Sequence, residues 1–314
     1  MLLDLINPSV PRQLCTYRGL PWGVRFIGSS QFAYAAGTEG NPSDGVDGTF
    51  DILGATNKTV RRWHNGGFGA NTFAWSRDGA LAYILAAPPG PTSGLAAESW
   101  EIHLVKQGQD HPLATLPGVP ARGGSEGDQL FLAFSPDGQY LALESTLTSS
   151  PNQEGWFQAW RVSDGSPLAP PRHGTAMAVW AQDSLFFWDQ AGVHRWDIGG
   201  TTSLILPGVS WLRPGASPDG KWIAYSVRDS TCLPHVNVLN VATGSSFQVS
   251  SGGRDGAIFL TPTILWDNEQ RPLDNPCALS RSLPTGLTFL YNVATRQESR
   301  STITAVTDVW PRMD

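Results

Sequence analysis

The chain has 314 residues, of which 40% are hydrophobic and only 15% are charged, and its net charge at pH 7 is −6. This hydrophobic content is sufficient for a large core. The negative net charge argues against a nucleic-acid partner, which needs a cationic surface. The 34 glycines, 24 prolines and 13 tryptophans indicate a turn-rich all-β protein rather than a disordered one. Since no run of about 18 apolar residues occurs, we expect no membrane-spanning helix.

A short turn between two apolar runs recurs along the chain. Residues 135–138 and 217–220 read Ser-Pro-Asp-Gly, and residues 76–79 carry Arg in place of Pro. Further copies keep the flanking pattern but lose part of the turn, at Ser29, Asp183, Thr261 and Asp314. The copies follow one another at intervals of roughly 35 to 60 residues, a period typical of propeller blades.

Each unit continues beyond its turn in the same way. A variable loop is followed by two alternating segments joined at a Gly, Asn or Asp turn, which predicts a third and a fourth strand. These segments are, in chain order, residues 50–63, 100–116, 157–169, 193–206, 236–249 and 287–300. No helical period competes with them, so each unit is predicted to be a four-stranded antiparallel meander.

The two ends of the chain fit the same series. Residues 1–18 have the pattern of third and fourth strands, and residues 303–314 have that of a first strand. Joining them builds a seventh blade and closes a ring that has no open edge. The second strand of this blade is missing, so we expect the native chain to continue past Asp314; a six-bladed ring with spare terminal strands is the alternative. Residues 1–314 are thus predicted to form one all-β domain, a seven-bladed β-propeller.

With these turns the sequence resembles the TolB-like, WD-repeat-like β-propeller family, whose blades carry Ser-Pro-Asp-Gly hairpins between their first two strands. The resemblance implies the fold and not the function, because such propellers serve unrelated roles. Prolyl oligopeptidases also carry such propellers, beside a hydrolase domain for which we expect no room here. In the turn, Pro presets φ, the Asp carboxylate accepts from a backbone N–H and Gly takes a positive φ. The motif aspartates are therefore predicted to cap turns, not to bind metal or act as acids.

The loops between second and third strands are expected to share one face of the ring, opposite the Ser-Pro-Asp-Gly hairpins. We call it the insertion face. Long insertions occupy residues 37–48, 87–99, 146–155, 228–235 and 267–286, whereas the fourth blade has only residues 189–192 there. Because loops held by a rigid scaffold commonly carry binding sites, we expect the function on this face. Free drift of long surface loops is the alternative.

Candidate binding residues on the insertion face are acidic, aromatic and basic, with one histidine. They are Asp44, Asp47, Trp100, Trp156, Arg228, His235, Arg271 and Arg281. Cys232 and Cys277 lie in insertions of adjacent blades; a disulfide between them would imply an oxidising compartment, and two free thiols are the alternative. The chain has no C-x-x-C pair and no calcium-loop spacing, so we expect neither a metal nor another cofactor.

These features predict a non-enzymatic scaffold that binds a protein or peptide partner through the insertion face. We expect it to belong to a larger extracytoplasmic or cell-surface assembly, with a cytoplasmic location as the alternative. A propeller enzyme, lactonase- or lyase-like with a metal in the central channel, would need several acidic residues where the first strands begin, and only Asp128 and Asp255 occur there. A glycan-binding module using Trp100 and Trp156 is a third possibility.

Overall fold

The computed structural model describes a large part of the chain. The described residues are 21–27, 31–37, 48–53, 59–65, 73–76, 78–86, 99–107, 109–117, 129–146, 155–169, 172–174, 176–272 and 282–303. None of them lies in a helix, and none provides a helix able to cross a membrane.

The described strands form six four-stranded sheets, numbered here in chain order. Sheet 1 contains β1 (Pro21–Ile27), β2 (Gln31–Gly37), β3 (Gly48–Leu53) and β4 (Thr59–Asn65), and sheet 2 contains β5 (Phe73–Trp75), β6 (Leu81–Ala86), β7 (Ser99–Lys106) and β8 (Gln109–Pro117). Sheet 3 contains β9 (Gln129–Phe134), β10 (Tyr140–Thr146), β11 (Trp156–Arg161) and β12 (Arg172–His173), and sheet 4 contains β13 (Ala176–Ala181), β14 (Ser184–Asp189), β15 (Gly192–Asp197) and β16 (Thr202–Pro207). Sheet 5 contains β17 (Leu212–Ala216), β18 (Trp222–Arg228), β19 (Pro234–Asn240) and β20 (Ser246–Gln248), and sheet 6 contains β21 (Arg254–Phe259), β22 (Ile264–Pro272), β23 (Ser282–Asn292) and β24 (Gln297–Arg300).

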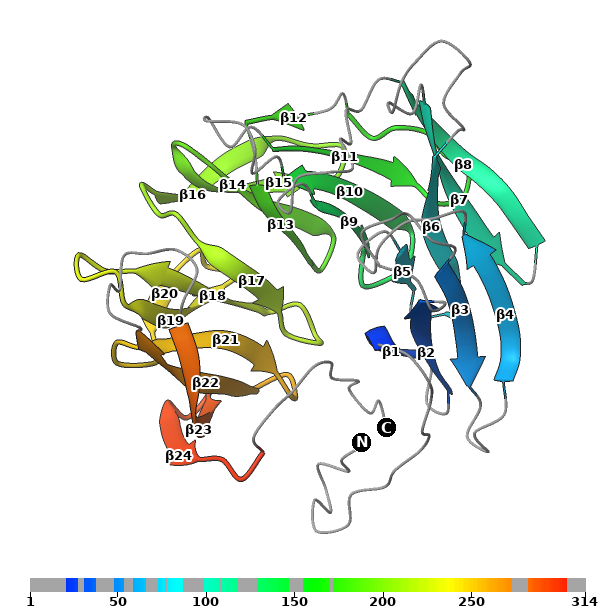
Figure 1. The fold of residues 1–314 in the computed structure, drawn as a ribbon. Coiled ribbons are helices and arrows are strands. Elements are labelled where there is room, and N and C mark those ends of the chain that lie inside the picture. Colours follow the sequence, from blue (N-terminus) through cyan, green and yellow to red (C-terminus); the bar gives the residue numbers. More distant parts are fainter. Residues whose placement is uncertain are drawn as a thin grey trace.

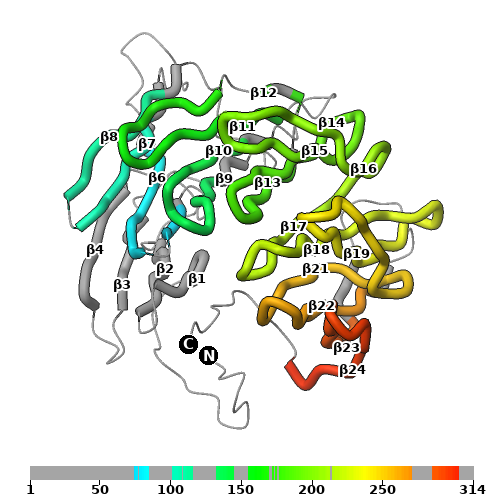
Figure 2. Tube along the Cα trace, turned by 180° about the vertical axis from the view of Figure 1, so that it is seen from behind, coloured from blue at the N-terminus to red at the C-terminus, as the bar shows by residue number. Residues whose placement is uncertain are grey.

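All six sheets are antiparallel meanders in which each strand pairs with the next one along the chain. They stand around a common centre, with the first strand of each sheet innermost (Figure 1; Figure 2 shows the same arrangement from behind). Each sheet contacts the next one along the chain. The predicted all-β architecture of four-stranded antiparallel blades is thus confirmed. The seventh blade falls on residues 1–18 and 303–314, of which only Ile303 is described, so the blade number and ring closure stay predictions.

The core consists of apolar layers between consecutive sheets, which we call seams. Leu141 and Leu143 face sheet 2 in one seam, whereas Ala142 between them faces sheet 4 in the next. In sheet 5, Ile223 and Tyr225 likewise face sheet 4, while Ala224 faces sheet 6. Because both faces of a blade are buried, its strands are continuously apolar. Full burial of each large side chain contributes about 1.5–3 kcal/mol.

The Ser-Pro-Asp-Gly turn between β9 and β10 is capped as predicted. Asp137 Oδ1 accepts from the backbone N–H of Gln139 at 3.0 Å and from the Ser135 hydroxyl at 2.6 Å. Gly138 has φ 71°, which an L-residue rarely adopts. The serine has a role that the sequence had not indicated: Ser135 is buried, and its oxygen accepts from the Tyr140 N–H at 3.0 Å.

Other copies of the turn keep this arrangement. In sheet 5, Asp219 Oδ1 accepts from the Ser217 hydroxyl at 2.7 Å and from the Lys221 N–H at 3.2 Å. In sheet 6 the aspartate is replaced, and the Thr261 hydroxyl oxygen accepts from the Ile264 N–H at 2.9 Å instead. The position therefore needs an acceptor oxygen rather than a carboxylate, which is consistent with a cap.

Candidate binding face

The second strands end, and the third and first strands begin, at the insertion face. At this end, four first strands contain a β-bulge, in which the strand advances by three residues while its partner advances by two. The bulges lie at Trp22/Arg25, Ala176/Val179, Leu212/Gly215 and Asp255/Ile258. A bulge leaves backbone groups outside the ladder, and buried ones need other partners. For the bulges of β13 and β21, the preceding sheet supplies a side chain.

Glu144 of β10 supplies such partners across the seam between sheets 3 and 4. Its Oε1 accepts from the N–H of Met177, a residue with φ 56°, and its Oε2 accepts from the N–H of Ala178 at 2.8 Å. The residue is only 7% exposed. Burial raises the pKa of Glu144 to about 7, although the two backbone N–H groups favour its charged form.

A similar bridge crosses the seam between sheets 5 and 6. The Ser226 hydroxyl donates to Asp255 Oδ1 at 2.7 Å, and the same oxygen accepts from the Gly256 N–H at 2.8 Å inside the bulge. Asp255, considered from the sequence as a channel acid, therefore joins two sheets. Among the described residues no group of three His, Cys, Asp or Glu side chains could hold a metal ion.

His235 lies on β19 immediately after the turn at residues 229–233. Its Nε2 donates to Asp229 Oδ2 at 2.7 Å, and its Nδ1 accepts from the Gln248 amide at 3.2 Å. The Thr231 hydroxyl, followed by His235, holds the pKa of the Asp229 carboxyl well below its usual range. Since both ring nitrogens are engaged, the histidine is oriented by its neighbours.

An equivalent histidine occurs in sheet 4, where the sequence indicated only an ordinary sheet residue. His194 Nε2 donates to Asp189 Oδ1 at 2.9 Å, and its ring stacks on Phe187 with centroids 5.2 Å apart. Asp189 also accepts from the Ala191 N–H at 2.8 Å and so caps the short turn. A sequence pattern could have revealed both pairs. In two adjacent blades an aspartate at the end of the second strand is followed by a histidine at the start of the third.

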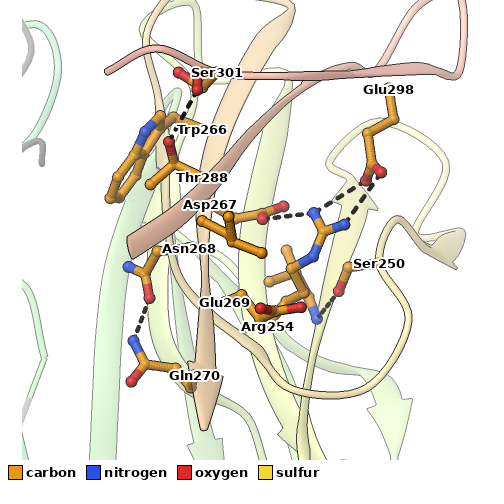
Figure 3. Close-up of polar contacts among 12 residues, drawn as sticks. Ser250, Arg254, Trp266, Asp267, Asn268, Glu269, Gln270, Thr288, Glu298 and Ser301 are labelled. Carbon is orange, nitrogen blue, oxygen red and sulfur yellow. Dashed lines mark hydrogen bonds and ion pairs between the residues drawn. The ribbon is translucent and has the colours of Figure 1, made fainter. Parts of the chain in front are cut away.

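A buried charged cluster lies in sheet 6 below this face (Figure 3). Arg254 Nη1 is 2.9 Å from Asp267 Oδ1, and both terminal nitrogens lie 3.1 Å from Glu298. The guanidinium carbon lies 3.2 Å from the centre of the Phe289 ring. Asp267 is fully buried, and its Oδ2 has no hydrogen-bond partner among the described residues. Burial raises the pKa of Asp267 to about 6, although Arg254 opposes the rise.

The predicted site residues are only partly brought together. His235 and Arg228 share the insertion face in sheet 5, and Arg228 donates to the Cys232 carbonyl at 3.3 Å. Trp156 is 8% exposed and packs in the seam between sheets 2 and 3, so it is inaccessible to a ligand on this face. Trp100 and Arg271 lie on β7 and β22, but their side chains are not described. Four further candidates lie outside the described residues: Asp44, Asp47, Arg281 and Cys277.

The insertion at residues 267–286, predicted as a loop, consists largely of strand. β22 and β23 remain paired as far as Arg271 with Leu283 and Pro272 with Ser282. Most of residues 267–286 is therefore a strand extension that rises from the insertion face. Polar residues such as Asn268 and Gln270 interrupt the alternation of apolar and polar residues that is typical of a strand, so the sequence did not predict one.

Comparison with known proteins gives a fold but no family. No family model matches the chain, and no curated protein matches it. A structure from work on two prolyl endopeptidases matches at 16% identity and TM-score 0.65, covering 93% of this chain and 42% of that one. Prolyl oligopeptidase B from Galerina marginata matches at 11% identity and TM-score 0.61, with 89% and 42% covered. TolB from Acinetobacter baumannii matches at 16% identity and TM-score 0.45, with 89% and 65% covered.

At these identities the matches show a β-propeller and nothing finer. The chain spans less than half the length of the peptidases that it matches. What the matches support of the predicted resemblance is the β-propeller fold alone.

The prediction of a non-enzymatic scaffold is contradicted, because the similar structures are mostly peptidases. The matches cover only part of each peptidase, so they assign no catalytic role to this chain. Residues 123–127 read Gly-Gly-Ser-Glu-Gly and have the spacing of a hydrolase nucleophile turn. Such a turn leads from a strand into a helix, and these residues lie between β8 and β9, outside the described part of the chain.

Proposed function

We propose that this propeller is the peptide-receiving module of a peptidase-type protein. In this role it holds a peptide at its insertion face, while the hydrolytic groups belong to another module. The observation that carries the proposal is the similarity of nearly the whole chain, 93%, to 42% of a prolyl endopeptidase structure. The Galerina marginata enzyme was solved bound to a 35mer substrate, which supports a peptide as the ligand.

The chemistry of the insertion face supports a polar, extended ligand. Hydrogen-bonded Asp–His pairs stand at the ends of sheets 4 and 5, and the exposed Arg228 lies beside the second pair. Ligand-binding surfaces of this kind orient a peptide through a few fixed polar groups on a rigid scaffold.

We further propose that a disulfide between Cys232 and Cys277 ties the connections of sheets 5 and 6 together, and that the protein functions in an extracytoplasmic compartment. Cys232 is disulfide-bonded, which supports this pairing. Peptide mapping by mass spectrometry with and without reductant tests it. A peptide joining residues 232 and 277 is expected before reduction, and a bond to Cys15 or two free thiols would exclude the pairing.

Peptide binding is tested with a fluorescein-labelled, proline-containing peptide of about 20 residues, a length within reach of such a face. Fluorescence anisotropy is expected to give saturable binding to the intact chain and no cleavage of the peptide. Arg228→Ala is expected to raise the dissociation constant by about tenfold or more, the effect of losing one hydrogen bond made by a charged group.

The matched control is Arg161→Ala, since Arg161 ends β11 on the opposite face of the ring and is similarly exposed. Equal effects of the two substitutions, or no binding at millimolar peptide, would refute the assignment of the face. Cleavage of the peptide by the chain alone would instead refute the placement of the hydrolytic groups in another module.

A further inference from the structure

The outermost strand of sheet 4 differs from the other outermost strands. β16 pairs with β15 alone and lies on the outside of the sheet, away from the common centre (Figure 1 and Figure 2). An edge strand offers unpaired N–H and C=O groups to a further strand, so proteins commonly obstruct it with charged residues or proline, or keep it short. The other described outermost strands each have one of these features: β4 has Arg61 and Arg62, β8 has Asp110 and Pro112, β24 has Glu298 and Arg300, and β12 and β20 have two and three residues.

β16 has none of these features. It reads Thr-Ser-Leu-Ile-Leu-Pro, with no charge and with proline only at its end. Leu204 is 43% exposed, and no other large hydrophobic side chain in the described part of the chain is as exposed. A bulge at Ile205 does not set the strand apart, since β4 and β8 are bulged too. The edge of β16 is therefore open to a further strand.

The pairing with β15 shows which backbone groups of β16 are open. The Asp197 N–H donates to the Thr201 carbonyl at 3.4 Å, directly before β16 begins. Residues of an antiparallel ladder alternate between bonding to the partner strand and pointing their N–H and C=O away from it. In the register of β15 and β16, Thr202 and Leu204 are the residues that point outward. Neither has a backbone partner on that side among the described residues.

The side chains beside these groups fit a neutral, apolar partner. Leu204 lies opposite His194, which lies opposite Phe187, so the three form a row across sheet 4. Phe187 is buried and stacks on the His194 ring, which leaves Leu204 as the exposed end of the row. Neighbouring side chains on adjacent strands pack against each other, so an apolar residue on a further strand would extend this row.

We propose that the outer edge of β16 binds an extended, uncharged peptide segment as a fifth strand of sheet 4. Two residues of the segment, two positions apart, lie opposite Leu204 and Thr202 in antiparallel orientation, and each exchanges a pair of hydrogen bonds with its partner. The residue opposite Leu204 is apolar. In this mode of recognition the main-chain bonds provide affinity and the alternate side chains provide specificity.

The length of the open edge favours a peptide segment over a second copy of the protein. Residues 202–204 precede the bulge and span about 10 Å of strand. A stable interface between two folded copies buries about 1,000 Å² or more, and pairing over so short an edge brings only a few side chains into contact. A flexible segment needs no further surface, because it follows the edge alone.

The inference does not rest on the proposed function, since the edge runs along the outside of sheet 4 and not across the insertion face. Its test uses the intact chain and a blocked, fluorescein-labelled peptide of seven alternating valines and threonines. Fluorescence anisotropy is expected to show saturable binding at up to millimolar peptide. The peptide is also expected to slow amide exchange at Thr202 and Leu204 about fivefold or more, the effect of one hydrogen bond each, and to leave Ser203 unchanged because it already bonds to β15.

Two comparisons separate pairing at this edge from other binding. Leu204→Lys gives β16 the charge that other edges carry, and at an exposed position it is expected to leave Tm unchanged and to weaken binding about tenfold. The matched control Ser299→Lys adds the same charge to β24, an edge that already carries charges, and is expected to leave binding unchanged. A peptide N-methylated at its valines keeps its side chains but lacks the donors, and is expected to bind about tenfold more weakly.

Three results would overturn the inference. No saturable binding at millimolar peptide, or equal binding of the N-methylated peptide, would exclude pairing through the backbone. Equal losses in Leu204→Lys and Ser299→Lys would exclude this edge as the site. A concentration-dependent dimer that Leu204→Lys abolishes, detected by sedimentation, would assign the edge to a second copy of the protein.

The insertion face is tested separately. Arg228→Ala is expected to leave binding of the valine–threonine peptide unchanged. A loss in Arg228→Ala without a loss in Leu204→Lys would overturn the inference about β16 and leave the proposed function in place.

Discussion

The buried carboxylate of Glu144 makes stability depend on pH in a predictable way. Its pKa is raised from 4.5 to about 7 because burial penalises the charged form. The folded protein therefore holds this proton more tightly than the unfolded chain does. The contribution of Glu144 to stability is fully present below pH 4.5 and is lost as the pH rises through about 7.

The magnitude follows from the two pKa values. One pH unit corresponds to about 1.4 kcal/mol, so the difference between 4.5 and about 7 amounts to about 3 kcal/mol of unfolding free energy. Glu144→Gln keeps the side-chain size but cannot ionise. Between pH 5 and pH 8 the unfolding free energy of the wild type is expected to fall, relative to that of the variant, by most of this difference.

The assay is urea unfolding at pH 5, 6, 7 and 8 for the wild type, Glu144→Gln and the control Asp183→Asn, which neutralises an exposed carboxylate. The Gln variant also loses one of two acceptors for Met177 and Ala178, which lowers stability equally at every pH. Only the slope of the unfolding free energy against pH therefore tests the prediction. Parallel curves for wild type and Glu144→Gln would refute the reasoning, as would an equal change of slope in Asp183→Asn.

Two further predictions concern buried charge and backbone conformation. Arg254→Met is expected to cost about 3–5 kcal/mol, because it leaves the fully buried Asp267 uncompensated, and adding Asp267→Asn should restore part of the loss; additive losses in urea unfolding would contradict this. Gly138→Ala and Gly220→Ala both force a side chain to positive φ, at roughly 1–2 kcal/mol each. Gly220→Ala should cost distinctly more, since its Cβ would lie 2.6 Å from the Gln182 nitrogen whereas the nearest atom at Gly138 is 3.6 Å away, and equal unfolding free energies would refute the close approach.

Several features of the molecule were accessible from the sequence because their causes are local. The Ser-Pro-Asp-Gly turns depend on the conformational preferences of three adjacent residues, so their spacing predicted the blades. The apolar alternation around them predicted the strands. The sequence resemblance extended to the propellers of prolyl oligopeptidases but gave no reason to prefer them, because the same repeats occur in propellers with unrelated roles.

The candidate face was predicted less completely. His235 was proposed as a candidate from its place beside an insertion, but its hydrogen bond to Asp229 depends on the geometry of one turn. Glu144 carried no sequence signal, because its partners are N–H groups of a bulge 33 and 34 residues away in the neighbouring sheet. The burial of Trp156 between sheets 2 and 3 could not be predicted, because it depends on which side of the strand the adjacent sheet covers.

The sequence by itself determined the four-stranded meander, its capping turns and the order of the strands, because each follows from contacts within about 40 residues of the chain, the length of one blade. Only the tertiary structure decided which side chains meet across the seams. Glu144 reaches the bulge of β13 across one seam, and Ser226 reaches Asp255 across another. These contacts depend on the rotation of one sheet relative to the next and on single-residue bulges. No repeat, period or motif in the chain encodes those two quantities.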